Sequence, residues 1–288
     1  MSLVADVFAP ALASRPDAEA LVARSGRLTY RQLDRRADQA ANALLAMGVR
    51  PGDRVAASLP NDLDVVLAFH GAMRIGAVWV GVNRALAPPE KQYIIDDSGA
   101  SLRLDDDWID EWHAALDAAS ADGRPDLEID PDAPAGIAYT SGTTGHPKGA
   151  VHSQRNLLTP GAVLVATRGY GPDLRKGDCL PLTILNMVVL TTLLVAQAEG
   201  CCIVMDRIDP EGVAQWVRDE RVTTWNGPPA LLHGLATNEA VRPEDLATLD
   251  EVWTGGADCP EAIRQMFERK FGQPVLATYG LSEAPTVV

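Results

Sequence analysis

The clearest hydrophobic pattern in the sequence is an amphipathic stretch that starts at Thr29 and ends at Gly48. Thr29, with Gln32 three residues later, forms a capping box that satisfies backbone N–H groups of the first helical turn. Apolar residues then recur every three or four positions and share one helix face. They are Leu33, Ala37, Ala40, Ala41, Leu44 and Leu45. Because Gly48 suits the left-handed residue that ends many helices, the pattern predicts a helix between these two residues.

Short apolar runs alternate with longer helical patterns along the rest of the chain. Strands are predicted at residues 53–59, 78–82, 135–139, 179–182, 201–205 and 222–225, and at the residues that lead into 253–257. Helices are predicted at residues 62–75, 156–167, 210–220 and up to 198, and the acidic stretch 104–132 is expected to hold a helix and then a surface connection. This alternation is typical of an α/β fold, with helix-covered, mainly parallel sheets.

One uncharged stretch, residues 179–198, is long enough to be considered as a membrane span. Pro181, three threonines and Asn186 interrupt it. Glu199 and Gly200 then indicate a helix C-terminus before a new buried strand. The stretch is therefore predicted to be buried core, and no membrane span is expected.

Composition narrows the function classes. The chain has 288 residues, 47% hydrophobic content and a formal net charge of -14 at pH 7, which allows one large or two ordinary domains. This acidity argues against nucleic-acid binding, which relies on Lys and Arg to neutralise phosphates. Neither a zinc site nor a disulfide framework is indicated, because no C-x-x-C pair is formed by Cys179, Cys201, Cys202 and Cys259. The N-terminus lacks the features of a signal peptide, so a cytoplasmic protein is expected.

Candidate chemistry gathers in residues 139–149, between a predicted strand and an amphipathic run from Ser153. This order predicts a strand–loop–helix junction. Glycines allow the backbone to approach a ligand, while hydroxyls and backbone amides can form an anion-binding concavity. The residues concerned are Thr140, Ser141, Gly142, Thr143, Thr144 and Gly145, with Lys148 as a cation. Such a loop suits a polyphosphate.

A Walker A loop is excluded, because Pro147 and Gly149 flank the lysine where that motif requires Gly and Ser or Thr. A flexible surface loop is the alternative that composition alone leaves open. The order of the residues, Tyr-Thr-Ser-Gly-Thr-Thr-Gly-His-Pro-Lys-Gly, favours phosphate binding. It closely resembles the phosphate-loop signature of the adenylate-forming superfamily, which includes acyl-CoA synthetases, luciferase-like enzymes and the adenylation domains of peptide synthetases.

Further stretches follow the same family in its order. Trp-Thr-Gly-Gly-Ala at 253–257 resembles the segment that lines the adenine and acyl pocket. Thr-Tyr-Gly-Leu-Ser-Glu at 278–283 resembles the Tyr-Gly-x-Thr-Glu segment. Residues 28–61 and 77–83 follow the family's N-terminal pattern, so the resemblance covers essentially the whole chain.

The resemblance implies an incomplete N-terminal domain of the acyl-CoA synthetase fold, with two sheets in an αβαβα-type arrangement and approximate subdomains 1–175 and 176–288. It also implies that ATP and a small carboxylic acid give an acyl-adenylate and pyrophosphate, after which the acyl group passes to a thiol. Coenzyme A is the expected acceptor, and the phosphopantetheine arm of a carrier protein is the alternative. Mg²⁺ is the expected metal, because the reaction joins two anions. A homo-oligomer is left open.

Site residues follow from the matching motif positions. The resemblance assigns the phosphates to residues 140–148 and makes Lys148 and Glu283 the catalytic residues, with Glu283 as the Mg²⁺ ligand because a hard cation prefers carboxylate oxygen. The other ATP-binding positions are Gly256, Ala257, Tyr279, Gly280 and Ser282, where Ser replaces the more common Thr. The substrate pocket is expected to include Trp225, Asn226, Gly227, Gly255 and Leu281.

Structural roles are the alternatives for several of these residues. Lys148 and Glu283 could be solvated surface charges, and Tyr279 and Trp225 could be core aromatics. His146 is interpreted as a solvent-facing loop residue. The remaining histidines are interpreted as structural or surface residues rather than metal ligands; they are His70, His113, His152 and His233.

Two departures from the family qualify the function. Pro-Leu-Thr-Ile at 181–184 replaces a Pro-Leu-Phe-His-like segment, so the aromatic ring and imidazole that approach the carboxylate are missing, and the acyl substrate cannot be assigned by analogy. The sequence ends five residues after Glu283, without the family's ribose-binding Asp segment or its mobile C-terminal domain. We therefore expect either a fragment of a longer enzyme or a short form that cannot complete catalysis alone, with a non-catalytic nucleotide-binding or interaction module as the alternative.

Overall fold

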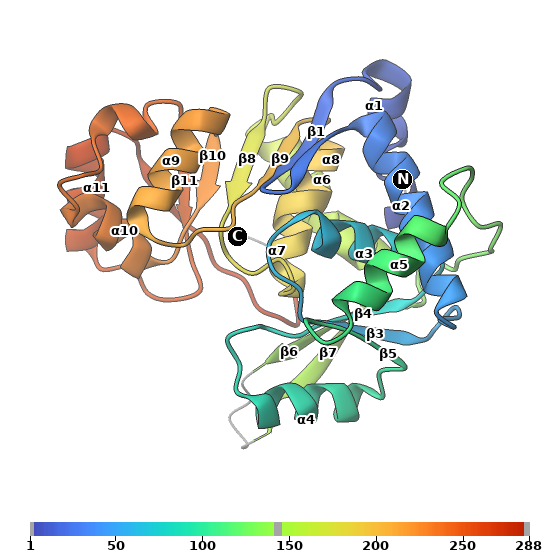
Figure 1. The fold of residues 1–288 in the computed structure, drawn as a ribbon. Helices are drawn as coiled ribbons and strands as arrows, with labels where there is room; N and C mark the ends of the chain where they lie inside the picture. The colour runs from blue at the N-terminus through green and yellow to red at the C-terminus, as the bar shows by residue number, and fades with distance from the viewer. Residues whose placement is uncertain (1–2, 141–145, 285–288) are drawn as a thin grey trace.

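The computed structural model describes residues 3–140 and 146–284, and its strands form two sheets (Figure 1). The five-stranded sheet has the order β5 (Leu102–Leu104), β3 (Arg54–Ala57), β4 (Val78–Gly81), β6 (Pro134–Thr140) and β7 (Lys148–Ser153). The seven-stranded sheet has the order β12 (Val275–Ala277), β11 (Glu251–Thr254), β10 (Thr224–Asn226), β8 (Arg175–Asp178), β9 (Cys201–Val204), β1 (Glu19–Ala23) and β2 (Gly26–Thr29).

Helices cover both sheets (Figure 1). In chain order they are η1 (Val4–Asp6), α1 (Ala9–Ser14), α2 (Tyr30–Ala46), α3 (Leu63–Arg74), α4 (Pro88–Ser98), α5 (Ile109–Ala118), α6 (Gln154–Arg168), α7 (Leu185–Val188), the π-helical turn η2 (Val189–Leu193), α8 (Leu194–Gln197), α9 (Pro210–Glu220), α10 (Pro229–Thr237), η3 (Pro243–Leu246) and α11 (Glu261–Phe271).

Most neighbouring strands are parallel, as the alternating pattern predicts. The antiparallel pairs among the described strands are β1 with β2 and β6 with β7, each at one edge of a sheet. Several of the elements above were not predicted from the sequence, among them β1, β2, α4, β5 and β7. The four strands are short or lie at sheet edges, where the hydrophobic pattern is weak.

Successive side chains of each strand face opposite sides of its sheet, and the residues packed on each side define the layers. Inward-facing Val55 and Trp79 of the five-stranded sheet share one core with Leu21 of β1 and Val204 of β9, and helices α2, α3, α6 and α8 contribute to the same core. The outer face of the seven-stranded sheet packs against α9, α10 and α11. The outer face of the five-stranded sheet packs against α4. The order is therefore helix, sheet, helix, sheet, helix, as predicted.

Local signals explain the best-predicted elements. Thr29 caps α2 through a full capping box: its Oγ1 accepts from the Gln32 backbone at 3.3 Å, and Gln32 Oε1 accepts from the Thr29 backbone at 2.9 Å. Gly48, at φ +94°, follows the helix in the left-handed conformation that favours glycine. Helix α3 matches its predicted range, with Asp62 as its N-cap.

The predicted strand at 179–182 is wrong by about one strand length, because β8 occupies Arg175–Asp178. Residues 182–198 are buried for the most part and form α7, η2 and α8, which agrees with the core prediction. None of the described helices has the length and hydropathy required to cross a membrane. The subdomain boundary after residue 175 stays a prediction; the seven-stranded sheet contains β1 and β2 as well as strands that follow that boundary.

Candidate functional site

The predicted phosphate loop connects two antiparallel strands. Thr140 at the end of β6 lies opposite Lys148 at the start of β7. The predicted strand–loop–helix junction is therefore wrong, because β7 intervenes and α6 begins only after Ser153, whose hydroxyl caps it. Five of the predicted ATP-binding residues lie outside the described part of the chain, and their assignment stays a prediction; they are Ser141, Gly142, Thr143, Thr144 and Gly145.

Helix α4 contacts this hairpin from one side. The Tyr139 hydroxyl donates to Asp97 Oδ2 at 2.7 Å, and burial together with this carboxylate raises the pKa of Tyr139. The Tyr93 hydroxyl donates to the Pro147 carbonyl at 3.2 Å. The Tyr93 ring also stacks on His146, with 5.3 Å between ring centroids. His146 is exposed, as expected, but its ring is held by an aromatic partner.

Two residues of β7 show why a strand forms there. A Cβ on Gly149 would lie 2.6 Å from Ile137 Cγ2, so glycine is needed for the two strands to approach. Lys148 is exposed at the mouth of the hairpin. No carboxylate in residues 3–140 or 146–284 forms an ion pair with it, so its charge is available to a ligand.

A cavity of about 480 Å³ lies at the carboxyl ends of β11 and β12. Thr254 pairs with Ala277, so the two parallel strands end together and the loops that follow them meet. The lining residues are Thr254, Gly256, Ala257, Asp258, Cys259, Ala277, Thr278, Tyr279 and Gly280. Four of them were predicted to bind ATP, whereas Asp258 and Cys259 were not identified from the sequence.

Gly255 allows the two loops to lie close together. A Cβ at this position would lie 2.4 Å from Thr278 Oγ1 and 2.9 Å from the Thr278 carbonyl oxygen. Thr278 is fixed by bonds from its backbone N–H and its hydroxyl to the Thr254 carbonyl, at 2.7 and 3.0 Å. Tyr279 is 65% exposed, so it is not a core tyrosine and its ring is free to meet a flat ligand.

The segment 279–284 runs from this cavity towards β7. His152 Nε2 lies 2.7 Å from the Ser282 carbonyl oxygen, and Asn186 Nδ2 lies 3.2 Å from that of Leu281. Ser282 and the exposed Glu283 are thereby held next to the hairpin that carries Lys148. His152 was interpreted from the sequence only as a structural or surface residue.

The predicted substrate-pocket residues are not all brought together. Trp225 is fully buried in the core beneath α9–α11, which is the alternative that the sequence left open. Its ring explains Gly227, because a Cβ there would lie 2.1 Å from Trp225 Cη2. Asn226 is partly exposed, with its Nδ2 4.0 Å from Met187 Sδ, and Leu281 is 48% exposed. The acyl slot itself stays a prediction.

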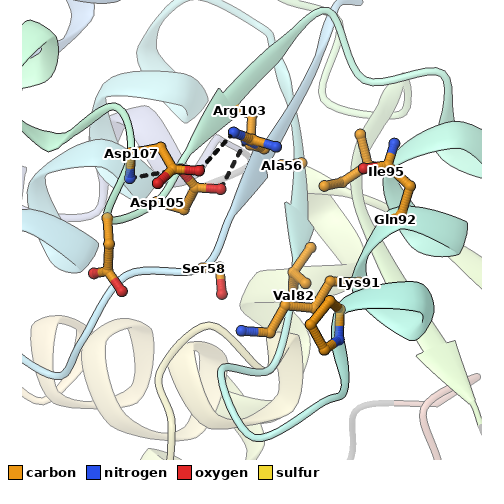
Figure 2. A pocket seen from close by; sticks show the side chains of 11 residues that line it. Ala56, Ser58, Val82, Lys91, Gln92, Ile95, Arg103, Asp105 and Asp107 are labelled. Carbon is orange, nitrogen blue, oxygen red and sulfur yellow. Dashed lines mark hydrogen bonds and ion pairs between the residues drawn. The ribbon is translucent and has the colours of Figure 1, made fainter.

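A second, polar cavity of about 260 Å³ lies where β3, β4 and β5 end beside α4 (Figure 2). Arg103 forms ion pairs with Asp105 and Asp107 on one side of it, and Lys91 lies on the opposite side. The Ser58 hydroxyl is buried there without a described partner. None of the predicted site residues lines this cavity, and no motif in the sequence indicates a function for it.

The first cavity and the segment that leads from it to Glu283 have features that suit a nucleotide and its metal. Small residues at 255–257 leave room for a flat base beside the exposed Tyr279 ring. Glu283 offers a solvent-accessible carboxylate, the donor that Mg²⁺ prefers. The described residues contain no preformed cluster of three metal-ligating side chains. A single carboxylate with ligand phosphates is the usual arrangement for Mg²⁺, so the residues present fit that ion.

Comparison with known proteins identifies the family and the relatives of this chain. The family model described as "AMP-binding enzyme" matches residues 8–288. The long-chain-fatty-acid–CoA ligase FadD13 of Mycobacterium tuberculosis (strain ATCC 25618 / H37Rv) is 32% identical over 90% of this chain and 55% of its own length. A feruloyl-CoA synthase of Streptomyces sp. is 34% identical over 96% of this chain and 59% of its own length. The chain thus spans little more than half of these relatives.

The same relationship appears in three dimensions. The N-terminal domain of FACL13 from Mycobacterium tuberculosis, solved with an inhibitor bound, superposes with a TM-score of 0.90. It is 28% identical and covers 99% of this chain, which covers 77% of it. The two-sheet fold and the resemblance of the motifs are both confirmed by these matches. This chain belongs to the AMP-binding enzyme family.

Proposed function

We propose that these residues form the ATP-binding part of an AMP-forming carboxylate–CoA ligase, which activates a carboxylic acid as an acyl-adenylate and then forms a thioester. The observation that carries the proposal is the arrangement around the cavity of about 480 Å³. Its wall continues into the segment that holds Glu283, and that segment is hydrogen-bonded to the strand that begins with the exposed cation Lys148. A base site, a metal-binding carboxylate and a phosphate-binding cation thus follow one another from the cavity to the hairpin.

Each group has a defined task in this reaction. The Tyr279 ring and residues 255–257 hold the adenine, and residues 140–148 hold the phosphates. A carboxylate oxygen of the acid attacks the α-phosphorus, and the bond to pyrophosphate breaks. Both reactants are anions, so the positive charge of Lys148 lowers the barrier where negative charge accumulates. Bound Mg²⁺, held by Glu283 and the phosphates, would neutralise further charge.

The acid and the thiol remain open within this proposal. The names of the relatives support a carboxylic acid as substrate and CoA as acceptor. Four further points stay predictions: bound Mg²⁺, a role in fatty acid metabolism, a cytoplasmic location and a homo-oligomer. The alternative acceptor is a carrier protein with a phosphopantetheine arm. The two acceptors are separated by incubating the complete polypeptide with ATP and an acid, and then measuring thioester formation with free CoA and with a holo carrier protein.

Lys148→Ala is expected to lower the rate of acyl-adenylate formation by about 10²–10³, the usual cost of removing one preorganised donor to developing charge. The measurement is pyrophosphate release by the complete polypeptide that contains these residues. Arg35→Ala is the matched control, because Arg35 is a cation on the exposed face of α2. Turnover by the Lys148 variant equal to that of the control would contradict the assignment of the loop.

A further inference from the structure

His152 occupies an unusual position for a polar side chain. It lies on β7 opposite Gly136 and is only 2% exposed. Its neighbour Val151 is 56% exposed, so the strand turns its imidazole, rather than its valine, towards the interior. The Nε2 atom lies 2.7 Å from the Ser282 carbonyl oxygen. A carbonyl oxygen can only accept, so Nε2 carries the hydrogen of this bond.

The other ring nitrogen shows that packing alone does not explain this histidine. Nδ1 is buried and has no hydrogen-bond partner among the described residues. Leaving a buried polar atom unpaired is unfavourable, and an aliphatic side chain at this position would avoid that cost. The imidazole is therefore accounted for by the bond that its Nε2 makes.

This bond joins two distant parts of the chain. His152 and Ser282 are 130 residues apart, and β7 belongs to the five-stranded sheet whereas residue 282 follows the last strand of the seven-stranded sheet. Segment 279–284 has no helix and only an isolated bridge between Leu281 and Ala284. An exposed bond from Asn186 to Leu281 also anchors the segment to a distant element. A buried imidazole is thus the firmest described contact between this segment and the hairpin.

We propose that His152 is a positioning residue: by holding the Ser282 carbonyl, it fixes the segment that carries Glu283 beside the phosphate-binding hairpin. The expected effect on nucleotide binding rests on the proposed function, whereas the contact itself rests on geometry alone. His152 does not touch the reacting atoms. It acts through Ser282 and Glu283, so its removal should weaken binding of the metal-bound nucleotide more than it disturbs the fold.

Two substitutions separate the hydrogen bond from packing. His152→Leu removes the donor and keeps an apolar side chain, whereas His152→Gln keeps an N–H donor on a side chain of similar reach. Hydrogen exchange of peptides that cover residues 279–284, measured on the ligand-free chain, tests the contact directly. We expect exchange to be about fivefold to tenfold faster in the Leu variant and close to wild type in the Gln variant, because a tenfold change corresponds to about 1.4 kcal/mol, near the upper end for one hydrogen bond. Identical exchange in all three proteins would overturn the proposal.

Calorimetric titration with MgATP tests the consequence. We expect His152→Leu to raise the Kd for MgATP about tenfold, and His152→Gln to retain most of the wild-type affinity. In a Glu283→Ala background, His152→Leu should raise the Kd little further, because both substitutions then remove the same contribution, that of Glu283 to binding. Full additivity in that background, or equal weakening by Leu and Gln, would show a merely structural role. If wild type binds no MgATP, the proposed function fails, while hydrogen exchange still decides the contact. His233→Leu, at an exposed site, is the control.

Discussion

Lys176→Met should lower the free energy of unfolding by about 3–5 kcal/mol, because it leaves a buried carboxylate without its cation. Lys176 and Asp178 lie on β8 and are both fully buried, with Nζ 3.3 Å from Oδ2. Asp178 also accepts from the Thr191 hydroxyl at 3.0 Å and from the Leu180 backbone at 3.1 Å. Desolvation raises the pKa of Asp178, and Lys176 opposes that change.

Denaturant unfolding of matched variants measures this effect. Arg155→Met is the control, since Arg155 pairs with Asp132 on the surface and such exposed pairs contribute about 0–1 kcal/mol. The double variant Lys176→Met, Asp178→Leu should recover much of the loss, because an apolar pair of similar size carries no buried charge. A loss in Lys176→Met no greater than that in Arg155→Met would contradict the account of β8.

Acid should destabilise the chain through His70, and His70→Leu should remove that part of the pH dependence. His70 is 1% exposed and packs against Phe8 and Phe69. Burial, with a smaller contribution from Arg74, lowers its pKa from 6.5 to about 3. Below pH 6.5 the unfolded chain therefore binds a proton that the folded chain does not. The stability that His70 contributes is fully present above pH 6.5. It is lost at about 1.4 kcal/mol per pH unit as the pH falls, which makes a total loss of about 5 kcal/mol near pH 3.

The check compares the free energy of unfolding of wild type and His70→Leu at pH 7, 6, 5 and 4. The difference between the two curves isolates this histidine from the carboxylates, which titrate in both proteins. His233→Leu, an exposed histidine, should retain the wild-type dependence. Parallel curves for wild type and His70→Leu would show that the buried imidazole is not the acid-sensitive group.

Local signals in the sequence predicted much of the fold. Capping residues and apolar spacing located α2, α3 and α9 almost to the residue. Strand β8 was missed because its sequence, Arg-Lys-Gly-Asp, reads as polar. It is buried only because Lys176 and Asp178 neutralise each other and Thr191 of η2 completes the bonding, and these are tertiary contacts that a hydrophobic pattern does not contain.

The candidate site was predictable where residues adjacent in sequence act together. Gly255–Ala257 and Tyr279 meet because parallel strands β11 and β12 end side by side. The hairpin was not predicted, because Lys148 and Gly149 at the start of β7 resemble a loop. The contact between His152 and Ser282 spans 130 residues, and no periodicity or motif in the sequence indicates it.

The central claim, that these residues bind nucleotide through a carboxylate-held metal, is tested most directly by calorimetric titration of MgATP into the 288-residue chain. Glu283→Ala is the test variant, and Glu239→Ala, at an exposed position outside the predicted motifs, is the control. We predict saturable binding by wild type and by the control, with a Kd raised at least about tenfold in Glu283→Ala. Absence of saturable binding, or equal affinity in all three proteins, would contradict the account.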